Sequence, residues 1–298
     1  MRGGFPHESS FKNGGWFKFR SGCDTLDGAW AQEKAASGPA KILVITREFV
    51  KPGKGGAPHD KAESAFVDAM SKAKWPTRYI AAQAMSGKPR VLFFTRYDSY
   101  DAWEKDVTAT TKNTTLSAAL DRANQADGEL LDSTDQNVFT YNEELSLRPV
   151  SDISHMRFLE IWVAHVKPGH YREWAELNKM YKAAYEKSVP DGHWAVYEAT
   201  YGFPNGTYLF LTARKSAAEL DRGPQDEKAT MAALGEEGMK KTDELFAACV
   251  ESSETQIFAF APQMSYPPDE FVKADPDFWK TKPATATTAK AEKKPTAD

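Results

Sequence analysis

Cysteine is nearly absent from this chain of 298 residues, which contains only Cys23 and Cys249. Two isolated cysteines supply neither the disulfide framework of a small secreted domain nor the ligand set of a structural zinc site. Cys249 falls in a predicted helix, where a free thiol usually packs as a small hydrophobic side chain. The sequence therefore predicts a buried thiol at Cys249.

Long apolar runs and an excess of basic charge are missing as well. No apolar stretch reaches the roughly 20 residues that are needed to span a bilayer. The formal net charge is −4 and the pI is near 5.9, whereas a nucleic-acid-binding protein usually carries a basic stripe. We therefore expect neither a transmembrane segment nor a nucleic-acid partner.

A working export signal is also missing. Ala29-Trp30-Ala31, followed by Gln32, has the small-residue pattern of a signal-peptidase site. Residues 17–28, however, contain charges and glycines where a signal peptide requires an apolar core. As written, the sequence has no working export signal, which favours the cytoplasm, but a different start would allow export and the compartment stays open.

Motifs for cofactors and metals are absent. No Gly-rich loop has Rossmann or Walker spacing, and no Ser or Cys lies in a nucleophile-elbow context. His165 and His170 are separated by a turn, so they lack the spacing of two ligands on one helix face, and His7, His59 and His155 are isolated in the sequence. We therefore expect no metal and no cofactor.

What the sequence does contain is a repeat. The motif Val-Lys-Pro-Gly occupies residues 50–53 and returns at residues 166–169. Each copy follows a β-branched apolar run, which predicts a strand, and precedes residues with apolar spacing of three to four, which predicts a helix. The repeated order of these signals indicates two homologous halves.

The agreement extends beyond the motif. The first helix of each half ends at a proline, in Trp75-Pro76 and Val189-Pro190, because proline disfavours helical backbone at the preceding residue. Hairpins follow around Gly87 and Gly206. In the first half we expect a short helix near residues 99–106, a longer helix over 115–131 and a closing strand over 136–143; in the second half a helix leads to a strand over 256–261.

Each half therefore has the order βαββαβ, and the fold class is α+β with two tandem ferredoxin-like domains. The predicted organisation has five parts: a flexible leader (1–40), a first barrel domain (41–149), a second barrel domain (150–264), a Pro/aromatic arm (265–280) and a disordered tail (281–298). We expect the arm to lie over the domains, because Phe271, Phe278 and Trp279 are too apolar for a free segment.

The strands are apolar on both faces. Phe139 and Tyr141 share one face of a closing strand, while Val138 points the other way. Such strands are typical of sheets that are buried on both sides. The simplest arrangement packs the two sheets against each other, as a closed barrel or as a sandwich.

With a strand that ends in Val-Lys-Pro-Gly before the first helix, the sequence resembles the dimeric α+β-barrel superfamily over residues 41–262. That group includes antibiotic-biosynthesis-monooxygenase-like, NIPSNAP-like and stress-response barrel proteins. The resemblance implies a covalent pseudo-dimer whose two halves form one α+β barrel. The motif marks a turn, so it transfers no catalytic residue to this chain.

Candidate site residues follow from alternation along the first strand of each half. Counting back from Val50 and Val166 places Arg47 and His165 on the face that should line the barrel. Arg47 would bind a ligand, pair with a carboxylate such as Glu143, or reach solvent at the rim. His165 is the candidate catalytic residue, because an imidazole titrates near neutral pH.

The remaining candidates are polar aromatic and imidazole side chains on strands. Residues of this kind belong more often to a core than to a site. The candidates for ligand binding are Tyr79, Tyr97, Tyr141, His193, Tyr197 and Tyr208.

Two functions are consistent with these observations. The first is a protein that binds a small apolar or aromatic molecule without clear catalytic machinery. The second is a cofactor-independent monooxygenase- or isomerase-like enzyme that holds an activated substrate in a dry barrel cavity. Binding is preferred because no acid–base pair stands out, and self-association into homo-oligomers stays open.

Overall fold

The computed structural model describes residues 38–280. Most of the predicted leader, including Cys23, and the whole predicted tail therefore lie outside the described residues. Within residues 38–280, no helix is long and apolar enough to cross a membrane.

Each half of the chain contains the elements that the sequence predicts, in the same order. The first half consists of β1 (Ile42–Val50), α1 (Ala57–Ala73), β2 (Tyr79–Ala84), β3 (Arg90–Tyr97), α2 (Tyr100–Lys112), α3 (Thr114–Gly128) and β4 (Leu131–Leu147). The second half consists of β5 (Phe158–Val166), α4 (Tyr171–Ser188), β6 (Trp194–Tyr201), β7 (Thr207–Arg214), η1 (Ala217–Arg222), α5 (Gly223–Cys249) and β8 (Val250–Phe260). The short elements η2 (Pro262–Met264), α6 (Asp269–Ala274) and α7 (Pro276–Trp279) follow. The two-fold βαββαβ order is confirmed.

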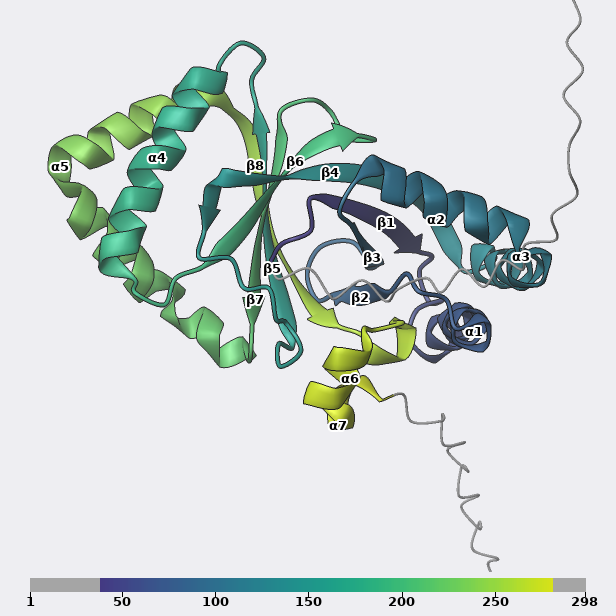
Figure 1. The fold of residues 1–298 in the computed structure, drawn as a ribbon. Helices are drawn as coiled ribbons and strands as arrows, with labels where there is room; N and C mark the ends of the chain where they lie inside the picture. The colour runs from purple at the N-terminus through teal and green to yellow at the C-terminus, as the bar shows by residue number, and fades with distance from the viewer. Residues whose placement is uncertain (1–37, 281–298) are drawn as a thin grey trace, which may run out of the picture. The chain divides into compact units, whose positions relative to one another are not determined.

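The eight strands form one closed barrel (Figure 1) in the order β1-β3-β2-β8-β5-β7-β6-β4. Two seams join the halves. Strand β2 pairs with β8 across one seam, and β6 pairs with β4 across the other. Each seam thus joins the second strand of one half to the last strand of the other. This is the arrangement of a dimeric α+β barrel with both subunits in one chain, and it decides between the barrel and the sandwich.

The barrel interior holds the largest apolar core of the described chain. Every strand sends alternate side chains inward, as the two-residue period of a strand requires. Inward-facing residues of this core include Leu43, Ile45, Ile80, Leu92, Phe94, Phe139, Leu159, Ile161, Val163, Tyr197, Leu209, Phe258 and Phe260.

Helices cover the outer face of the barrel. In the second half, α4 and α5 pack side by side over a core that contains Val166, Trp174 and Cys249 (Figure 1). The Cys249 thiol is fully buried, which confirms the prediction made for it. In the first half, α1 packs against α3, and α2 places Trp103 over the outer side chains of β1.

Two helix predictions for the first half need correction. The helix that begins near residue 100 extends to Lys112, and the next helix is Thr114–Gly128 rather than 115–131. Asn113 explains the first boundary, because it ends α2 and its Oδ1 accepts a hydrogen bond from the Leu116 backbone N–H at 3.0 Å, which caps α3. Strand β4 begins at Leu131 and continues to Leu147, so it is longer than the predicted 136–143.

Residues 265–280 pack against the barrel. Phe271 and Trp279 belong to the interior core cluster, and Trp279 is 1% exposed. Its indole Nε1 donates a hydrogen bond to the Ser154 carbonyl at 2.6 Å. The segment between the two halves and the segment after them thus meet at one end of the barrel.

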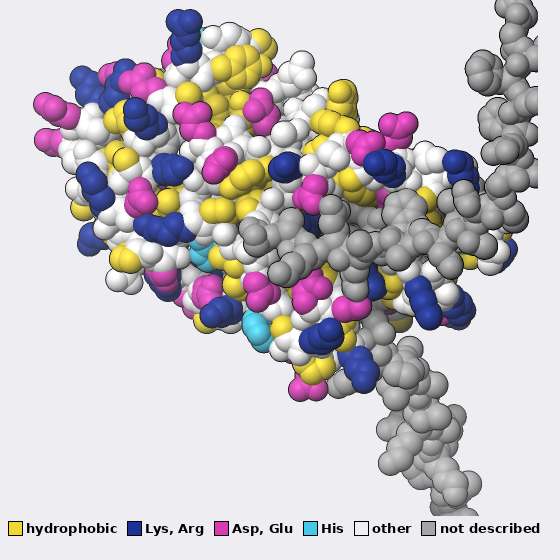
Figure 2. Space-filling model, in the orientation of Figure 1, with side chains coloured by type: hydrophobic (Ala, Val, Ile, Leu, Met, Phe, Trp, Pro, Cys, Tyr) yellow, Lys and Arg dark blue, Asp and Glu magenta, His cyan; other side chains and the backbone are white. Residues whose placement is uncertain are grey.

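The surface carries mixed charge. On the face shown in Figure 2, Lys and Arg side chains alternate with Asp and Glu side chains over α4 and α5. No stripe of one sign runs across that face, which agrees with the net charge of −4.

Candidate functional site

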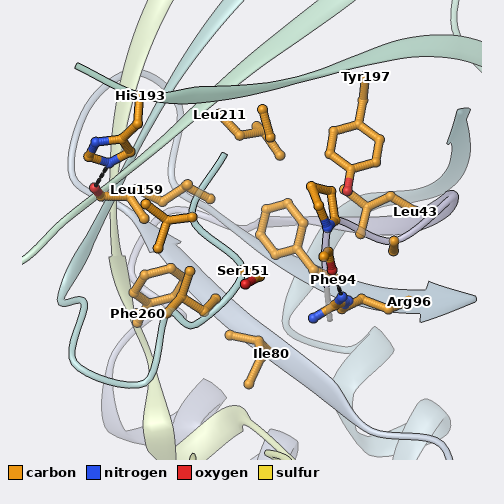
Figure 3. A pocket seen from close by; sticks show the side chains of 17 residues that line it. Leu43, Ile80, Phe94, Arg96, Ser151, Leu159, His193, Tyr197, Leu211 and Phe260 are labelled. Atoms are coloured by element: carbon orange, nitrogen blue, oxygen red, sulfur yellow. Dashed lines mark hydrogen bonds between the residues drawn. The ribbon is translucent and has the colours of Figure 1, made fainter. Parts of the chain in front are cut away.

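A cavity of about 120 Å³ lies inside one end of the barrel (Figure 3). Strands other than β4 supply its walls, and residues 38–40 and the linker between the halves supply the rest. Most of the lining is apolar: Leu43, Ile80, Phe94, Leu159, Leu211, Ala213 and Phe260, with Val150 and Ile153 from the linker. Polar side chains in the lining are Arg96, Ser151, His193 and Tyr197.

Both ring nitrogens of His193 contact backbone carbonyls. Nε2 lies 3.0 Å from the Ala213 oxygen, and Nδ1 lies 3.0 Å from the Asp191 oxygen. A neutral imidazole has one N–H, so the tautomer decides which of the two carbonyls accepts a hydrogen bond. Both nitrogens face backbone carbonyls, which leaves neither directed at a molecule in the cavity.

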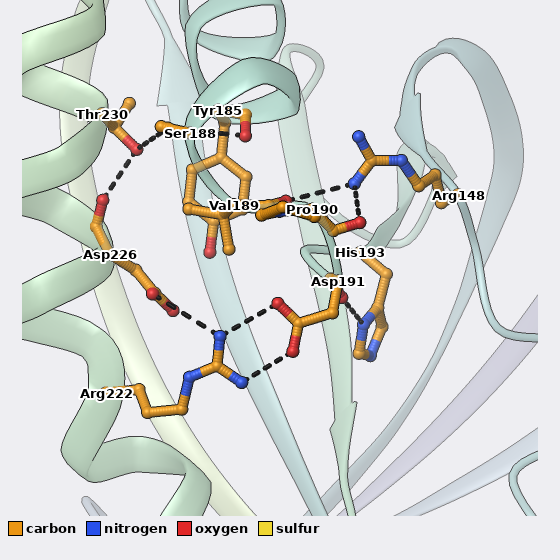
Figure 4. A network of polar contacts seen from close by, with 10 residues as sticks. All are labelled: Arg148, Tyr185, Ser188, Val189, Pro190, Asp191, His193, Arg222, Asp226 and Thr230. Atoms are coloured by element: carbon orange, nitrogen blue, oxygen red, sulfur yellow. Dashed lines mark hydrogen bonds and ion pairs between the residues drawn. The ribbon is translucent and has the colours of Figure 1, made fainter.

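The loop that precedes His193 is held from two sides (Figure 4). The Arg222 guanidinium binds the Asp191 carboxylate at two points, 2.6 Å and 2.9 Å, and this contact lowers the pKa of Asp191 to about 2. From the other side, Nη1 of Arg148 donates to the carbonyls of Val189 and Pro190. These contacts fix the start of β6 and with it the position of the His193 ring.

Tyr197 points into the barrel from the middle of β6, and its side chain is almost fully buried. Burial raises the pKa of its hydroxyl well above the usual value, since the charged phenolate would lose its hydration. The ring packs edge-on against Tyr141, with 5.5 Å between ring centroids. Tyr197 is therefore a neutral phenol that can donate or accept a hydrogen bond.

Arg96 and Ser151 lie at the edge of the cavity. Arg96 donates to the Gly38 carbonyl at 2.5 Å, which ties the segment before β1 to the rim (Figure 3). Neither residue was among the sequence candidates. Arg96 could have been found by alternation, because it shares a face of β3 with Leu92 and Phe94, but Ser151 lies in the linker, where no periodicity applies.

Arg47 and His165 lie on the inward face, as alternation predicts, but at the other end of the barrel. His165 Nδ1 lies 3.0 Å from Thr207 Oγ1. The Arg47 guanidinium stacks over the Phe203 ring at 4.4 Å from its centroid and binds Asp135. The carboxylate partner is thus Asp135, which faces Arg47 across β1 and β4, and not the suggested Glu143.

The other tyrosine candidates divide between the two faces of the barrel. Tyr141 packs against the interior core next to Tyr197. Tyr97 and Tyr208 lie on the outer face, where the Tyr97 hydroxyl donates to Asp106 at 2.7 Å and the Tyr208 hydroxyl donates to Glu198 at 3.2 Å. Tyr79 also lies outside, against Phe93. Of the sequence candidates, the cavity therefore brings together His193 and Tyr197.

Comparison with known proteins returns similarity of backbone only. No protein-family model matches this sequence, and no curated protein matches it. Solved structures with a similar backbone include a proposed monooxygenase from Fusobacterium nucleatum (14% identity, 74% of this chain and 93% of that chain, TM-score 0.48). A mutant chlorite dismutase from Candidatus Nitrospira defluvii is similar over 82% of this chain and 98% of its own length (8% identity, TM-score 0.48). A proposed monooxygenase from Lactobacillus acidophilus is similar over 74% of this chain and 94% of that chain (9% identity, TM-score 0.45).

Proposed function

We propose that this protein binds a small apolar or aromatic molecule in the cavity at the end of its barrel. The observation that carries the proposal is a cavity of about 120 Å³ with an apolar lining and a few polar groups at its edge. An engineered cavity of about 150 Å³ lined by Leu, Ile and Phe stays dry and binds benzene. The volume therefore favours a ligand of one ring or a short aliphatic chain.

The polar groups of the cavity suit orientation of a ligand rather than catalysis. His193 uses both ring nitrogens on backbone carbonyls, and the Tyr197 hydroxyl keeps its proton because burial raises its pKa. A hydroxyl or carbonyl on the ligand would have Tyr197 and Ser151 as hydrogen-bond partners.

The alternative function, a cofactor-independent oxygenase or isomerase, requires a base that faces the substrate. The sequence candidate for that base is His165. It hydrogen-bonds Thr207 at the opposite end of the barrel, and it is not part of the cavity lining. Binding without chemistry is therefore the preferred function.

The substitution Ala213→Leu tests the proposal by filling the cavity. Ala213 is 7% exposed and lines the cavity, so the added carbons take the space of a ligand. We expect parent protein to bind members of a panel of benzene, phenol, cresols and indole, and the variant to bind them at least about tenfold more weakly, the loss of roughly 1.4 kcal/mol. Calorimetry and the ligand-induced change in Tm measure the binding of each panel member to the parent and to the variant.

A matched control is Ala118→Leu, the same change at an exposed position of α3. It should leave binding unchanged. Equal affinity of the parent and the Ala213→Leu variant, or no binding of any panel member by the parent, contradicts the proposed site.

A further inference from the structure

Four ionisable side chains meet on the outside of β1, on the face opposite to the barrel cavity. Glu48 comes from β1, His59 and Glu63 come from the first two turns of α1, and Asp127 comes from the last turn of α3. One potential ligand atom from each residue lies within 4.8 Å of the others. We refer to these four residues as the outer cluster.

The imidazole lies at the centre of this group. His59 Nε2 is 3.2 Å from Glu48 Oε2, 3.4 Å from Asp127 Oδ1 and 3.9 Å from Glu63 Oε1. Two ligand atoms that share a metal ion at about 2.1 Å are about 3.0 to 3.4 Å apart in octahedral or tetrahedral geometry. The distances from His59 Nε2 to Glu48 and Asp127 lie in that range. The distance to Glu63 is longer, and a small rotation of the Glu63 side chain would bring it into the same range.

Burial separates the outer cluster from an ordinary group of surface acids. The His59 side chain is 0% exposed, those of Glu63 and Asp127 are 3% exposed, and that of Glu48 is 12% exposed. Glu63 Oε1 and Asp127 Oδ1 accept no hydrogen bond, although His59 Nε2 lies 3.9 Å and 3.4 Å from them, and the nearby Tyr79 hydroxyl has no hydrogen-bond partner either. Buried polar atoms are usually satisfied, so buried oxygens without a hydrogen bond that lie this close together suit a further positive partner between them.

The electrostatics reflect the same crowding of acidic groups. Burial, followed by the nearby Glu48 carboxylate, raises the pKa of both Glu63 and Asp127. For His59, burial acts to lower the pKa, but the contacts with Glu48 and Asp127 outweigh it and the pKa is raised. Three buried carboxylates this close together require positive charge or bound protons between them.

The second half of the same chain shows that the fold does not need such a cluster. Ala164 lies two residues before Val166, as Glu48 lies two residues before Val50. The buried side chains in the first two turns of α4 are Trp174 and Leu177, in the place of His59 and Glu63. The corresponding region of the second half is thus a closed apolar core, so the outer cluster is a property of the first half alone.

We infer that the outer cluster of Glu48, His59, Glu63 and Asp127 binds one divalent first-row transition metal ion, such as Zn²⁺ or Mn²⁺. One imidazole nitrogen together with three carboxylates is a donor set for Zn²⁺, Mn²⁺ or Fe²⁺, whereas Ca²⁺ and Mg²⁺ prefer oxygen ligands alone. This site is separate from the barrel cavity, because Glu48 and the inward-facing Arg47 point to opposite faces of β1.

The sequence contained one signal for this site. His59 and Glu63 are four residues apart, the spacing that places two side chains on one face of a helix. The other two ligands lie on β1 and at the end of α3, and no local pattern connects them to α1. Considered alone in the sequence, His59 is therefore an isolated histidine.

A metal titration of the full-length protein tests the inference directly. The protein is first stripped with a chelator and dialysed. Titration with ZnCl₂ and, separately, MnCl₂ should show one bound ion per chain by calorimetry and by elemental analysis, with an increase in Tm. CaCl₂ should bind more weakly than either. Because the ligands must lose protons, binding should release protons and weaken as the pH falls.

Two isosteric variants, Glu63→Gln and Asp127→Asn, should each weaken the affinity at least about tenfold, since changes even to supporting groups around a metal have effects of that size. Glu104→Gln, an exposed residue of α2, is the matched control and should bind as the parent does. A further variant, Glu48→Ala combined with Glu63→Leu, copies the apolar second half; it should fold without loss of Tm in metal-free buffer and should not respond to ZnCl₂.

Absence of a stoichiometric ion in the parent protein overturns the inference. Equal binding by the parent and by both isosteric variants overturns it as well, because the ion would then lie on exposed histidines elsewhere.

Discussion

At the scale of single residues, the contact between Arg47 and Asp135 illustrates how a partly buried cation is paired. Arg47 Nε lies 2.7 Å from Asp135 Oδ1, and Nη2 lies 2.6 Å from Oδ2. This two-point hydrogen bond is the main reason that the pKa of Asp135 lies below its ordinary value of 3.8. A carboxyl group whose pKa is lowered on folding stabilises the fold above its unfolded-state pKa, and it loses that effect as the pH falls through the folded-state pKa.

The substitution Asp135→Asn should therefore lower Tm at neutral pH and have little effect in strong acid. We expect the difference in Tm between parent and variant to be constant above about pH 5 and to shrink as the pH falls below the unfolded-state value near 4. Thermal unfolding followed by circular dichroism from pH 2 to 7 measures it. A difference in Tm that grows as the pH falls would show that the carboxylate is not stabilised by Arg47.

At the scale of elements, the short helices α6 and α7 act as a cover for one end of the barrel. Trp279 packs against Phe260, Phe271 and Phe278 with ring centroids 6.2, 5.7 and 4.9 Å away. Phe260 also lines the cavity. Through Trp279, the arm thus packs against Phe260, a residue of the cavity wall.

Removal of the indole in Trp279→Ala should destabilise the protein by about 3 to 5 kcal/mol, the usual range for a large aromatic side chain in a core. Denaturant unfolding gives the value. Tyr201→Ala, at a side chain that is 61% exposed, is the comparison and should cost much less. Similar losses at the two positions would mean that the arm does not contribute to the stability of the barrel.

At the scale of the whole molecule, the two seams show how each half completes the other. In a half taken alone, the strand order would be β4-β1-β3-β2, with both edge strands unpaired and the inward apolar face uncovered. Open edges and large apolar faces promote association with another chain. The second half pairs with both edge strands and covers the apolar face.

A fragment that comprises residues 38–149 should consequently not persist as a folded monomer. We expect it to form a dimer through the same β2-to-last-strand seams, or to aggregate. Size-exclusion chromatography with light scattering, run beside the full chain, distinguishes these species. A stable folded monomer of the fragment would show that the barrel halves do not depend on each other.

The sequence by itself determined the order of elements and the existence of two halves. The Val-Lys-Pro-Gly turns, the prolines after the first helices and the alternation of apolar residues act locally, so they can be recognised without the fold. The same alternation placed Arg47 and His165 inside the barrel. It could not assign them to an end of the barrel, because position along the axis depends on register with neighbouring strands.

Only the tertiary structure decided which residues act together. Asp135 rather than Glu143 meets Arg47 because β4 pairs with β1 in a register that no local pattern specifies. The cavity collects side chains from strands and linkers of both halves, and the outer cluster joins Glu48 to Asp127 across most of the first half. Such groupings arise from the packing of helices on a closed sheet, where residues far apart in the chain come within a few ångströms of one another.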